Sequence, residues 1–209
     1  MISNTSREKK ILFNVLYLVS FAEGAALMAV ELLSAKIMAP HYGTSLYVWT
    51  AVLATTLGGL ALGYFFGGII SRKYPTEKTL YLIIALSSIA SGLLPVTGEW
   101  ITQVTMVLEL KSGIMVSALV LLTPPLLLFG MVSPMIINLL SKNVSLAGKS
   151  AGTVFAVSTL GGILAVFLAG FYLIPFAGIN ASALCLGIAL AIWPLLFWSK
   201  QFVRKNPAK

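Results

Sequence analysis

Residues 11–38 read ILFNVLYLVSFAEGAALMAVELLSAKIM, an apolar run interrupted by three charged side chains, Glu23, Glu31 and Lys36. As an α-helix this run is roughly 42 Å long, which is enough to cross the ~30 Å hydrocarbon core of a bilayer. It is too long for the apolar part of a signal peptide, and no short small-residue cleavage site ends it. We therefore predict a retained transmembrane helix.

The rest of the chain has the same character. Of its 209 residues, 58% are hydrophobic and 10% are charged, whereas soluble domains carry roughly 25% charged residues. So little charge cannot cover a surface that faces water, so the lipid bilayer is the expected partner. We predict an all-α integral membrane protein with about six transmembrane helices, at residues 11–38, 45–71, 78–94, 113–140, 150–173 and 179–198. The domain organisation is an N-terminal tail (1–10), a transmembrane domain (11–200) and a basic C-terminal tail (201–209).

Helix-breaking residues divide these stretches. Ser45 is placed to cap the second helix, and Pro175 with Gly178 predicts a turn before the sixth. Pro124 and Pro125 fall inside the fourth stretch and should kink or break it, because each proline removes a backbone donor. Residues 100–110 are less apolar, and we expect a short helix there at the outer membrane interface, with an extension of the fourth helix as the alternative.

The distribution of basic residues predicts the orientation. With the N-terminus inside, twelve Lys and Arg residues are cytoplasmic and only two, Lys36 and Lys111, are on the outer side. This separation predicts a multi-pass protein of the inner (plasma) membrane with both termini in the cytoplasm. The cytoplasmic set is Arg7, Lys9, Lys10, Arg72, Lys73, Lys78, Lys142, Lys149, Lys200, Arg204, Lys205 and Lys209.

A short repeat links the second and fifth stretches. Residues 56–59 and 159–162 both read TLGG, an offset of 103 that also maps Gly67 onto Gly170. Helices two and five cross the membrane in opposite directions, as a 3+3 inverted repeat resembling half of an MFS transporter requires. A chance match between glycine-rich apolar segments is the alternative.

Glycines also define a helix-packing surface. Gly59, Gly63 and Gly67 stand at i, i+4 and i+8, so they form a smooth strip that another backbone can approach. Ser158 and Gly162 form a similar pair in the fifth stretch. Tight helix packing is the favoured interpretation, and a substrate path along the strip is the alternative.

Two carboxylates within the first helix are the strongest functional candidates. A charge at membrane depth is costly, so Glu23 and Glu31 should face a partner or water. They are about 12 Å apart along the helix and about 80° around it, so they could line one cavity. A structural role is the alternative, in which Glu31 pairs with a neighbouring helix and Glu23 is protonated and hydrogen-bonded. The candidate substrate or ion pathway comprises Glu23, Glu31, Lys36, His41, Tyr47, Trp49, Tyr64 and Ser158.

Other functions are disfavoured by residue types. With one His, one Cys and no Asp, a metal site built on these ligands is not expected, and a Ser-His-Asp triad cannot be assembled. The basic residues are not interleaved with aromatics as a base-stacking groove requires, so nucleic acid is not expected as a partner. We therefore expect no metal, no cofactor and no catalytic residues in this chain alone.

Residues 24–50 (GAALMAVELLSAKIMAPHYGTSLYVWT) and 60–68 (LALGYFFGG) resemble the transmembrane domain of membrane-bound, fused MFS/spermidine synthase-like proteins. The element at 130–134 (GMVSP) and the segment from Gly152 to Gly178 are similar to later elements of that family. The chain departs from the family where Lys36 replaces a common Arg, Ser158 a common Asn and Ser71 a common Asp. Fused members continue into a soluble nucleotide-binding domain, whose glycine-rich turn is absent here.

Three functions follow from the resemblance and the residues. The chain could be the membrane subunit of a two-part system that docks a soluble spermidine synthase-like protein on its cytoplasmic face. It could be a six-helix half-transporter of polyamine-like cations that forms a homodimer of twelve helices. It could instead be an accessory or structural subunit of a larger membrane complex.

Overall fold

The computed structural model describes residues 2–141 and 144–205, and every regular element within them is helical. The all-helical prediction is therefore confirmed for these residues. The elements are α1 (Ile2–Tyr42), α2 (Leu46–Lys73), α3 (Glu77–Gly92), α4 (Leu94–Thr105), α5 (Leu110–Leu140), α6 (Val144–Leu168), the π-helix η1 (Ala169–Ala177) and α7 (Gly178–Lys205).

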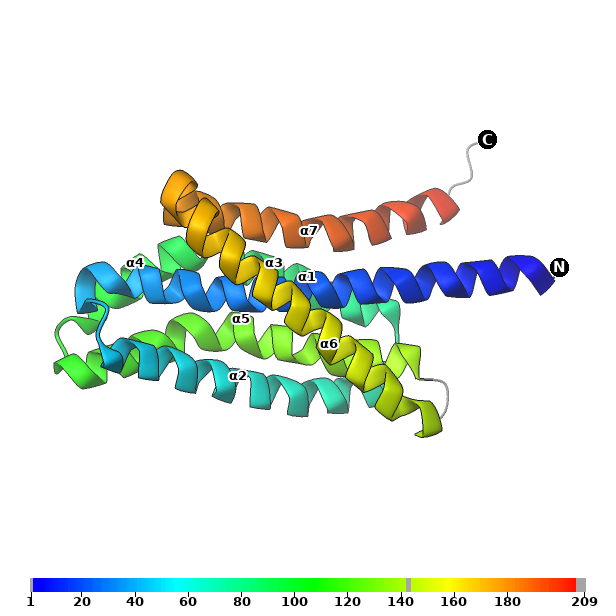
Figure 1. The fold of residues 1–209 in the computed structure, drawn as a ribbon, viewed down its shortest axis with the longest axis horizontal. Helices are drawn as coiled ribbons and strands as arrows, with labels where there is room; N and C mark the ends of the chain where they lie inside the picture. Colours follow the sequence, from blue (N-terminus) through cyan, green and yellow to red (C-terminus); the bar gives the residue numbers. More distant parts are fainter. Residues whose placement is uncertain (1, 142–143, 206–209) are drawn as a thin grey trace.

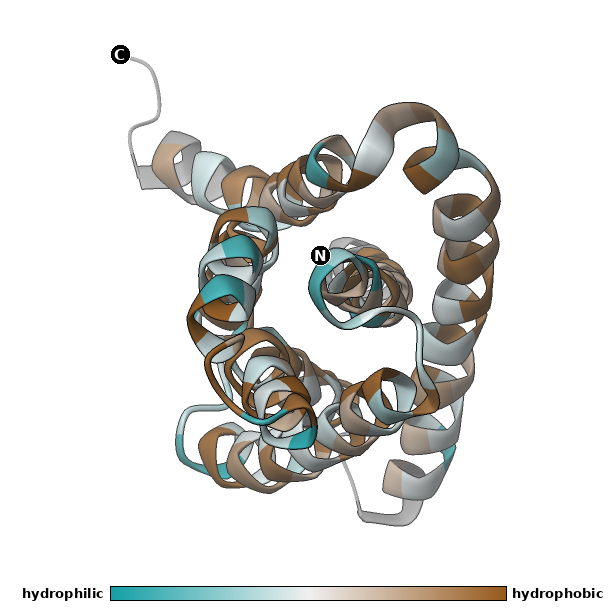
Figure 2. Ribbon diagram, turned by 90° about the vertical axis from the view of Figure 1, so that its left-hand side faces the viewer, coloured by the Kyte–Doolittle hydropathy of each residue, from teal (hydrophilic) through white to brown (hydrophobic). Residues whose placement is uncertain are grey.

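The long helices run back and forth along the long axis of the bundle (Figure 1). α1 begins and α7 ends at the same end, which also holds the connection between α2 and α3. Viewed along this axis, α1 lies inside a ring formed by the other helices (Figure 2). It contacts α6, α5, α7, α2 and α4. The first helix is therefore the centre of the bundle, and four of its polar side chains are buried: Ser20, Glu23, Glu31 and Ser34.

Four stretches are long and apolar enough to cross a membrane: Ile11–Tyr42, Leu46–Lys73, Leu110–Leu140 and Ala147–Ser199. A fifth candidate is the pair α3 and α4, which is bent by 55° between the two helices. Within the last stretch the chain turns back at η1, so that α6 and α7 run in opposite directions (Figure 1). The described helices thus form a multi-pass membrane bundle.

Small residues bring α2 and α5 close together. A Cβ atom added to Gly63 would lie 2.7 Å from the Cα of Gly130, and one added to Gly67 would lie 2.6 Å from the Cα of Met131. Gly59 faces the Cβ of Leu126 in the same way, at 3.0 Å. Backbone-to-backbone packing of this kind is how membrane helices associate without a hydrophobic driving force.

Local signals fix several helix ends. The Ser45 side chain accepts a hydrogen bond from the Val48 amide (3.5 Å), as the capping prediction required. Gly43 (φ 71°) and Gly178 (φ 80°) adopt left-handed conformations where α1 ends and α7 begins. The turn expected around Pro175 and Gly178 is present, but the residues before it form a π-helix rather than a loop.

Three sequence expectations differ from the structure. α5 is not broken at Pro124 and Pro125 but is one helix through both prolines, held by packing against α1, α2 and α3; the alternative of a kink there stays a prediction. The short helix expected at 100–110 instead spans Leu94–Thr105, because Pro95 lies in its first turn, where the missing amide costs nothing. The first and last helices also extend to Ile2 and Lys205, into the segments expected to be tails.

Candidate functional site

A carboxylate lies in the centre of the bundle. Glu23 on α1 is 3% exposed, and its Oε2 accepts a hydrogen bond from Ser158 Oγ of α6 at 3.1 Å. The adjacent Gly24 makes this contact sterically feasible, because a Cβ there would overlap the Ser158 carbonyl group. A Cβ on Gly161, about one turn further along α6, would likewise overlap the Phe21 carbonyl oxygen. The glycines thus allow α6 to approach α1 closely enough for Ser158 to reach Glu23.

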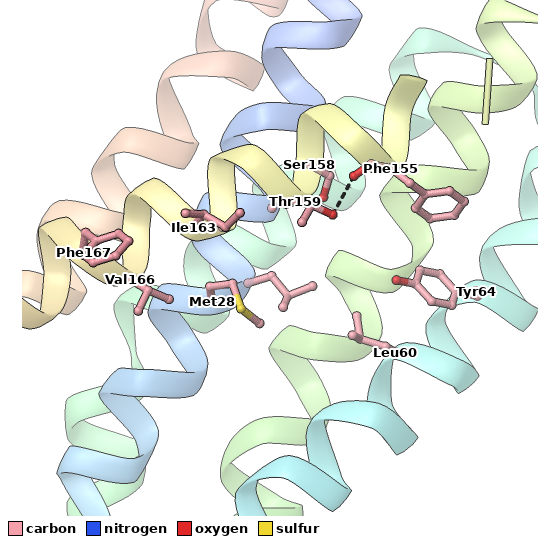
Figure 3. A pocket seen from close by; sticks show the side chains of 12 residues that line it. Met28, Leu60, Tyr64, Phe155, Ser158, Thr159, Ile163, Val166 and Phe167 are labelled. Carbon is pink, nitrogen blue, oxygen red and sulfur yellow. Dashed lines mark hydrogen bonds between the residues drawn. The ribbon is translucent and has the colours of Figure 1, made fainter. Parts of the chain in front are cut away.

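A cavity of about 460 Å³ lies next to this pair, between α1, α2 and α6. Its walls are mainly apolar, and Figure 3 shows Met28, Leu60, Ile163 and Phe167 among them. Side chains of this kind hold the body of a ligand, whereas a few polar groups fix its orientation.

Three hydroxyl groups interrupt the apolar walls. Thr159 donates to the Phe155 carbonyl oxygen of its own helix at 2.8 Å, so its hydrogen is already used. Ser158 lies at the inner wall, where it donates to Glu23. The Tyr64 hydroxyl points from α2 toward the space in front of α1 and α6 (Figure 3). Of these three groups, Ser158 is the one that contacts the Glu23 carboxylate, which lies behind the cavity wall and does not itself line the cavity.

The depth of Glu23 is set by its position in α1. It follows Ile11 by about 18 Å and precedes Tyr42 by about 28 Å along the helix, so it lies within the membrane-crossing part. Glu31 is 9% exposed and lies one turn beyond Leu27, which lines the cavity. Neither carboxylate forms an ion pair with a cation whose side chain the structure describes.

The other predicted pathway residues lie elsewhere. Lys36 is exposed and does not contact Glu31 as an ion pair, and His41 lies about 27 Å from Glu23 along α1. Tyr47 and Trp49 are 54% and 38% exposed near the start of α2, where the Lys111 Nζ lies 5.3 Å from the centre of the Tyr47 ring. The structure therefore groups Glu23, Tyr64 and Ser158, and places Lys36, His41, Tyr47 and Trp49 outside the cavity.

The glycines predicted for packing divide between two contacts. Gly59, Gly63 and Gly67 face α5, away from the cavity. Gly162 lines the cavity and faces Met28 and the carbonyl group of Gly24. The α2 strip is therefore a helix contact, whereas Gly162 belongs to the site.

Sequence reasoning missed most of the cavity wall. Phe155, Val166 and Phe167 carry no signal, because apolar residues in a membrane helix look alike whether they face lipid or a cavity. Gly24 carried a usable signal, since a glycine beside a buried charge in a helix interior indicates a close backbone approach. Among the described residues, no group of three His, Cys, Asp or Glu side chains could hold a metal ion.

The length and hydropathy of the helices define a multi-pass helical membrane protein. No protein-family model, curated protein or solved structure matches the chain.

Proposed function

We propose that this chain is a membrane carrier subunit that binds a polyamine-like organic cation beside Glu23. One observation carries the proposal: Ser158, which lines a 460 Å³ cavity, donates a hydrogen bond to the buried Glu23 carboxylate directly behind the cavity wall, within the membrane-crossing part of α1. A carboxyl group in such a place is stable either when it is protonated or when it is paired with a cation. Exchange between these two states would couple cation binding to proton release.

The walls of the cavity suit the body of such a cation. Polyamines and alkylamines carry ammonium groups on methylene chains, which pack well against Met28, Leu60 and Ile163. The Tyr64 and Ser158 hydroxyls can accept hydrogen bonds from the ammonium group, and the Glu23 carboxylate supplies the opposite charge. An inorganic cation would leave the apolar walls without a partner.

Helix packing supports an inverted repeat. Adding 103 to the residue numbers relates α1, α2 and α3 to α5, α6 and α7. α2 packs along α5 and its counterpart α6 packs along α1, while α3 packs against α7. The contacts of the TLGG segments agree in part: Gly162 lies next to Met28 and Gly24, and Gly59 lies next to Leu126 and Leu127, of which Leu127 is the residue 103 positions after Gly24. In inverted-repeat transporters, substrates bind between the two halves near the bilayer midplane.

Six crossings follow if α3 with α4 counts as one span and α6 and α7 as two. Six crossings with both ends of the transmembrane domain on one side match half of a twelve-helix transporter. A homodimer would then be the transporting unit, with the basic end of the bundle in the cytoplasm of a cell with an inner (plasma) membrane.

Binding and flux of spermidine test the proposal. In proteoliposomes at equal protein density, the unchanged chain should take up labelled spermidine, and binding should release protons into a weakly buffered medium. Glu23→Gln should lower uptake at least tenfold. Glu99→Gln is the matched control, because Glu99 is exposed on α4 and lies outside the cavity. A Glu23→Gln variant that transports as well as the unchanged chain would refute the proposal.

A second candidate rests on the basic end of the bundle. Exposed Arg72, Lys73, Lys78 and Lys149 lie at the end where α1 begins and α7 ends. This face could dock a separate soluble, spermidine synthase-like enzyme. Pull-down from native membranes in mild detergent tests this function: a stoichiometric nucleotide-binding partner supports it, and recovery of the chain alone in repeated preparations contradicts it.

A further inference from the structure

A second cavity, of about 300 Å³, lies at the basic end of the bundle between α1, α3 and α7. Three aromatic rings and one carboxylate line it: Tyr81, Trp193, Phe197 and Glu77. It shares no residue with the cavity beside Glu23. A ligand bound in this second cavity would therefore be distinct from the cation proposed for the cavity beside Glu23.

The aromatic rings are held in place by neighbouring helices. Tyr81 of α3 is 4% exposed and stacks on Phe197 of α7, with ring centres 4.3 Å apart and planes 23° apart. Trp193 precedes Phe197 by one helical turn, so both rings lie on the same side of α7. Glu77 precedes Tyr81 by one turn on α3, which places its carboxylate on the same side as the rings. Aromatic faces combined with a carboxylate form a typical site for an ammonium group.

The mouth of this cavity is aliphatic. Ile11 and Leu196 line it and are 55% and 51% exposed, on the flank of the bundle where lipid chains would lie. Glu77 is the first residue of α3, and Ile11 begins the membrane-crossing part of α1. The cavity therefore sits at the boundary between the hydrocarbon core and the head groups, with its opening toward the bilayer.

Charge around the cavity favours a zwitterionic ligand. Arg72, Lys73 and Lys78 are exposed and lie within five residues of Glu77. A free polyamine would be repelled by these cations on its way to Glu77. A phospholipid head group instead carries a phosphate that these cations attract, next to an ammonium group that the carboxylate and rings attract.

We propose that this cavity binds the ammonium head group of a phospholipid from the adjoining leaflet, such as phosphatidylethanolamine. The ammonium group contacts the Glu77 carboxylate and the faces of Trp193 and Phe197. The phosphate lies toward the basic residues of the α2–α3 connection. The acyl chains leave the cavity between Ile11 and Leu196 and run along the outside of α1 and α7.

Native mass spectrometry of the purified chain in detergent tests this site. The chain is titrated with phosphatidylethanolamine, phosphatidylcholine and phosphatidylglycerol that carry the same acyl chains. Both ammonium lipids should bind about fivefold more tightly than phosphatidylglycerol, as expected for a partly exposed cation–π and carboxylate contact of this size. Equal affinity for the three lipids would overturn the proposal, because acyl-chain contacts alone would then explain the binding.

Variants then assign the preference to this cavity. Glu77→Gln and Trp193→Leu should each reduce binding of phosphatidylethanolamine about fivefold and leave phosphatidylglycerol unchanged, whereas Glu99→Gln should change neither. Thermal unfolding of each variant shows whether it is folded. If a variant does not fold, the comparison of the three lipids on the unchanged chain decides the proposal. Displacement of phosphatidylethanolamine by equimolar spermidine would overturn the lipid assignment in favour of a soluble cation. Failure of spermidine transport would leave this proposal intact, since the two cavities are separate.

Discussion

Glu23 is acceptable at the centre of the bundle because Ser158 donates to it and Gly24 leaves room for that contact. If no donor reached this buried carboxyl group, its oxygens would lose their hydrogen bonds to water without replacement, and the folded state would be destabilised by that loss. The sequence placed both Glu23 and Ser158 among the candidates but could not pair them. They are 135 residues apart, and their contact depends on how α6 crosses α1.

Ser158→Ala tests this pairing at the level of stability. The variant should lower the free energy of unfolding by about 1 kcal/mol, as interhelical hydrogen bonds in membranes do. Thr159→Val is the matched control, because Thr159 bonds only to its own helix and should cost less than about 0.5 kcal/mol. Reversible unfolding in mixed micelles measures both. Equal losses for the two variants would show that the Ser158 contact contributes nothing specific.

At the scale of elements, hydropathy and the Pro and Gly positions located most helices. The same signals could not predict how helices face one another, because lipid-facing and packed positions have the same apolar composition. α4 shows a limit of these local signals. A proline such as Pro95 is compatible both with the end of one helix and with the first turn of the next, so it does not locate the boundary alone. α5 illustrates another limit, because contacts with five other helices keep it in one piece where Pro124 and Pro125 alone could have broken it.

The α2–α5 contact makes a sharp prediction. Gly63→Ala should lower the free energy of unfolding by about 1–3 kcal/mol, because the new Cβ would lie 2.7 Å from the Gly130 Cα, in backbone that cannot move aside. Gly58→Ala in the same helix should be neutral or stabilising by up to about 1 kcal/mol, because no atom lies within 4 Å of its added Cβ. Thermal unfolding in one detergent compares the two. Similar melting temperatures would contradict the close approach.

The reversal between α6 and α7 makes a second prediction at this scale. Gly178 has φ 80°, so Gly178→Ala should destabilise the chain by about 1–2 kcal/mol through backbone strain alone. Gly170→Ala is the control in the preceding π-helix, because its added Cβ would meet only the Leu32 Cδ2 at an ordinary 3.7 Å. An unchanged unfolding midpoint for Gly178→Ala would show that the reversal does not need a left-handed residue.

At the scale of the whole molecule, the fold places a group of exposed basic side chains at one end of the bundle. The described chain brings the α2–α3 connection to the end where α1 begins, and Arg72, Lys73 and Lys78 lie there (Figure 1). Lys111 lies at the other end, at the start of α5. The cavity beside Glu23 lies between these ends, and the proposed lipid site lies at the basic one. The direction in which the bundle sits in the membrane therefore decides from which side each site is reached.

Cysteine labelling in intact cells tests this orientation. In a Cys185→Ser background, Thr44→Cys at the α1–α2 connection should react with a membrane-impermeant maleimide from outside. Thr76→Cys at the α2–α3 connection should react only after permeabilisation, since basic loops remain in the cytoplasm. Both threonines are exposed and lie next to helix ends, so their reactivity reports access rather than packing. The reverse pattern would place the basic end outside, and labelling of both from outside would contradict a crossing by α2. With the predicted pattern, spermidine reaching Glu23 from the cytoplasm would pass the basic end, which would slow its entry at low salt and less so at high salt.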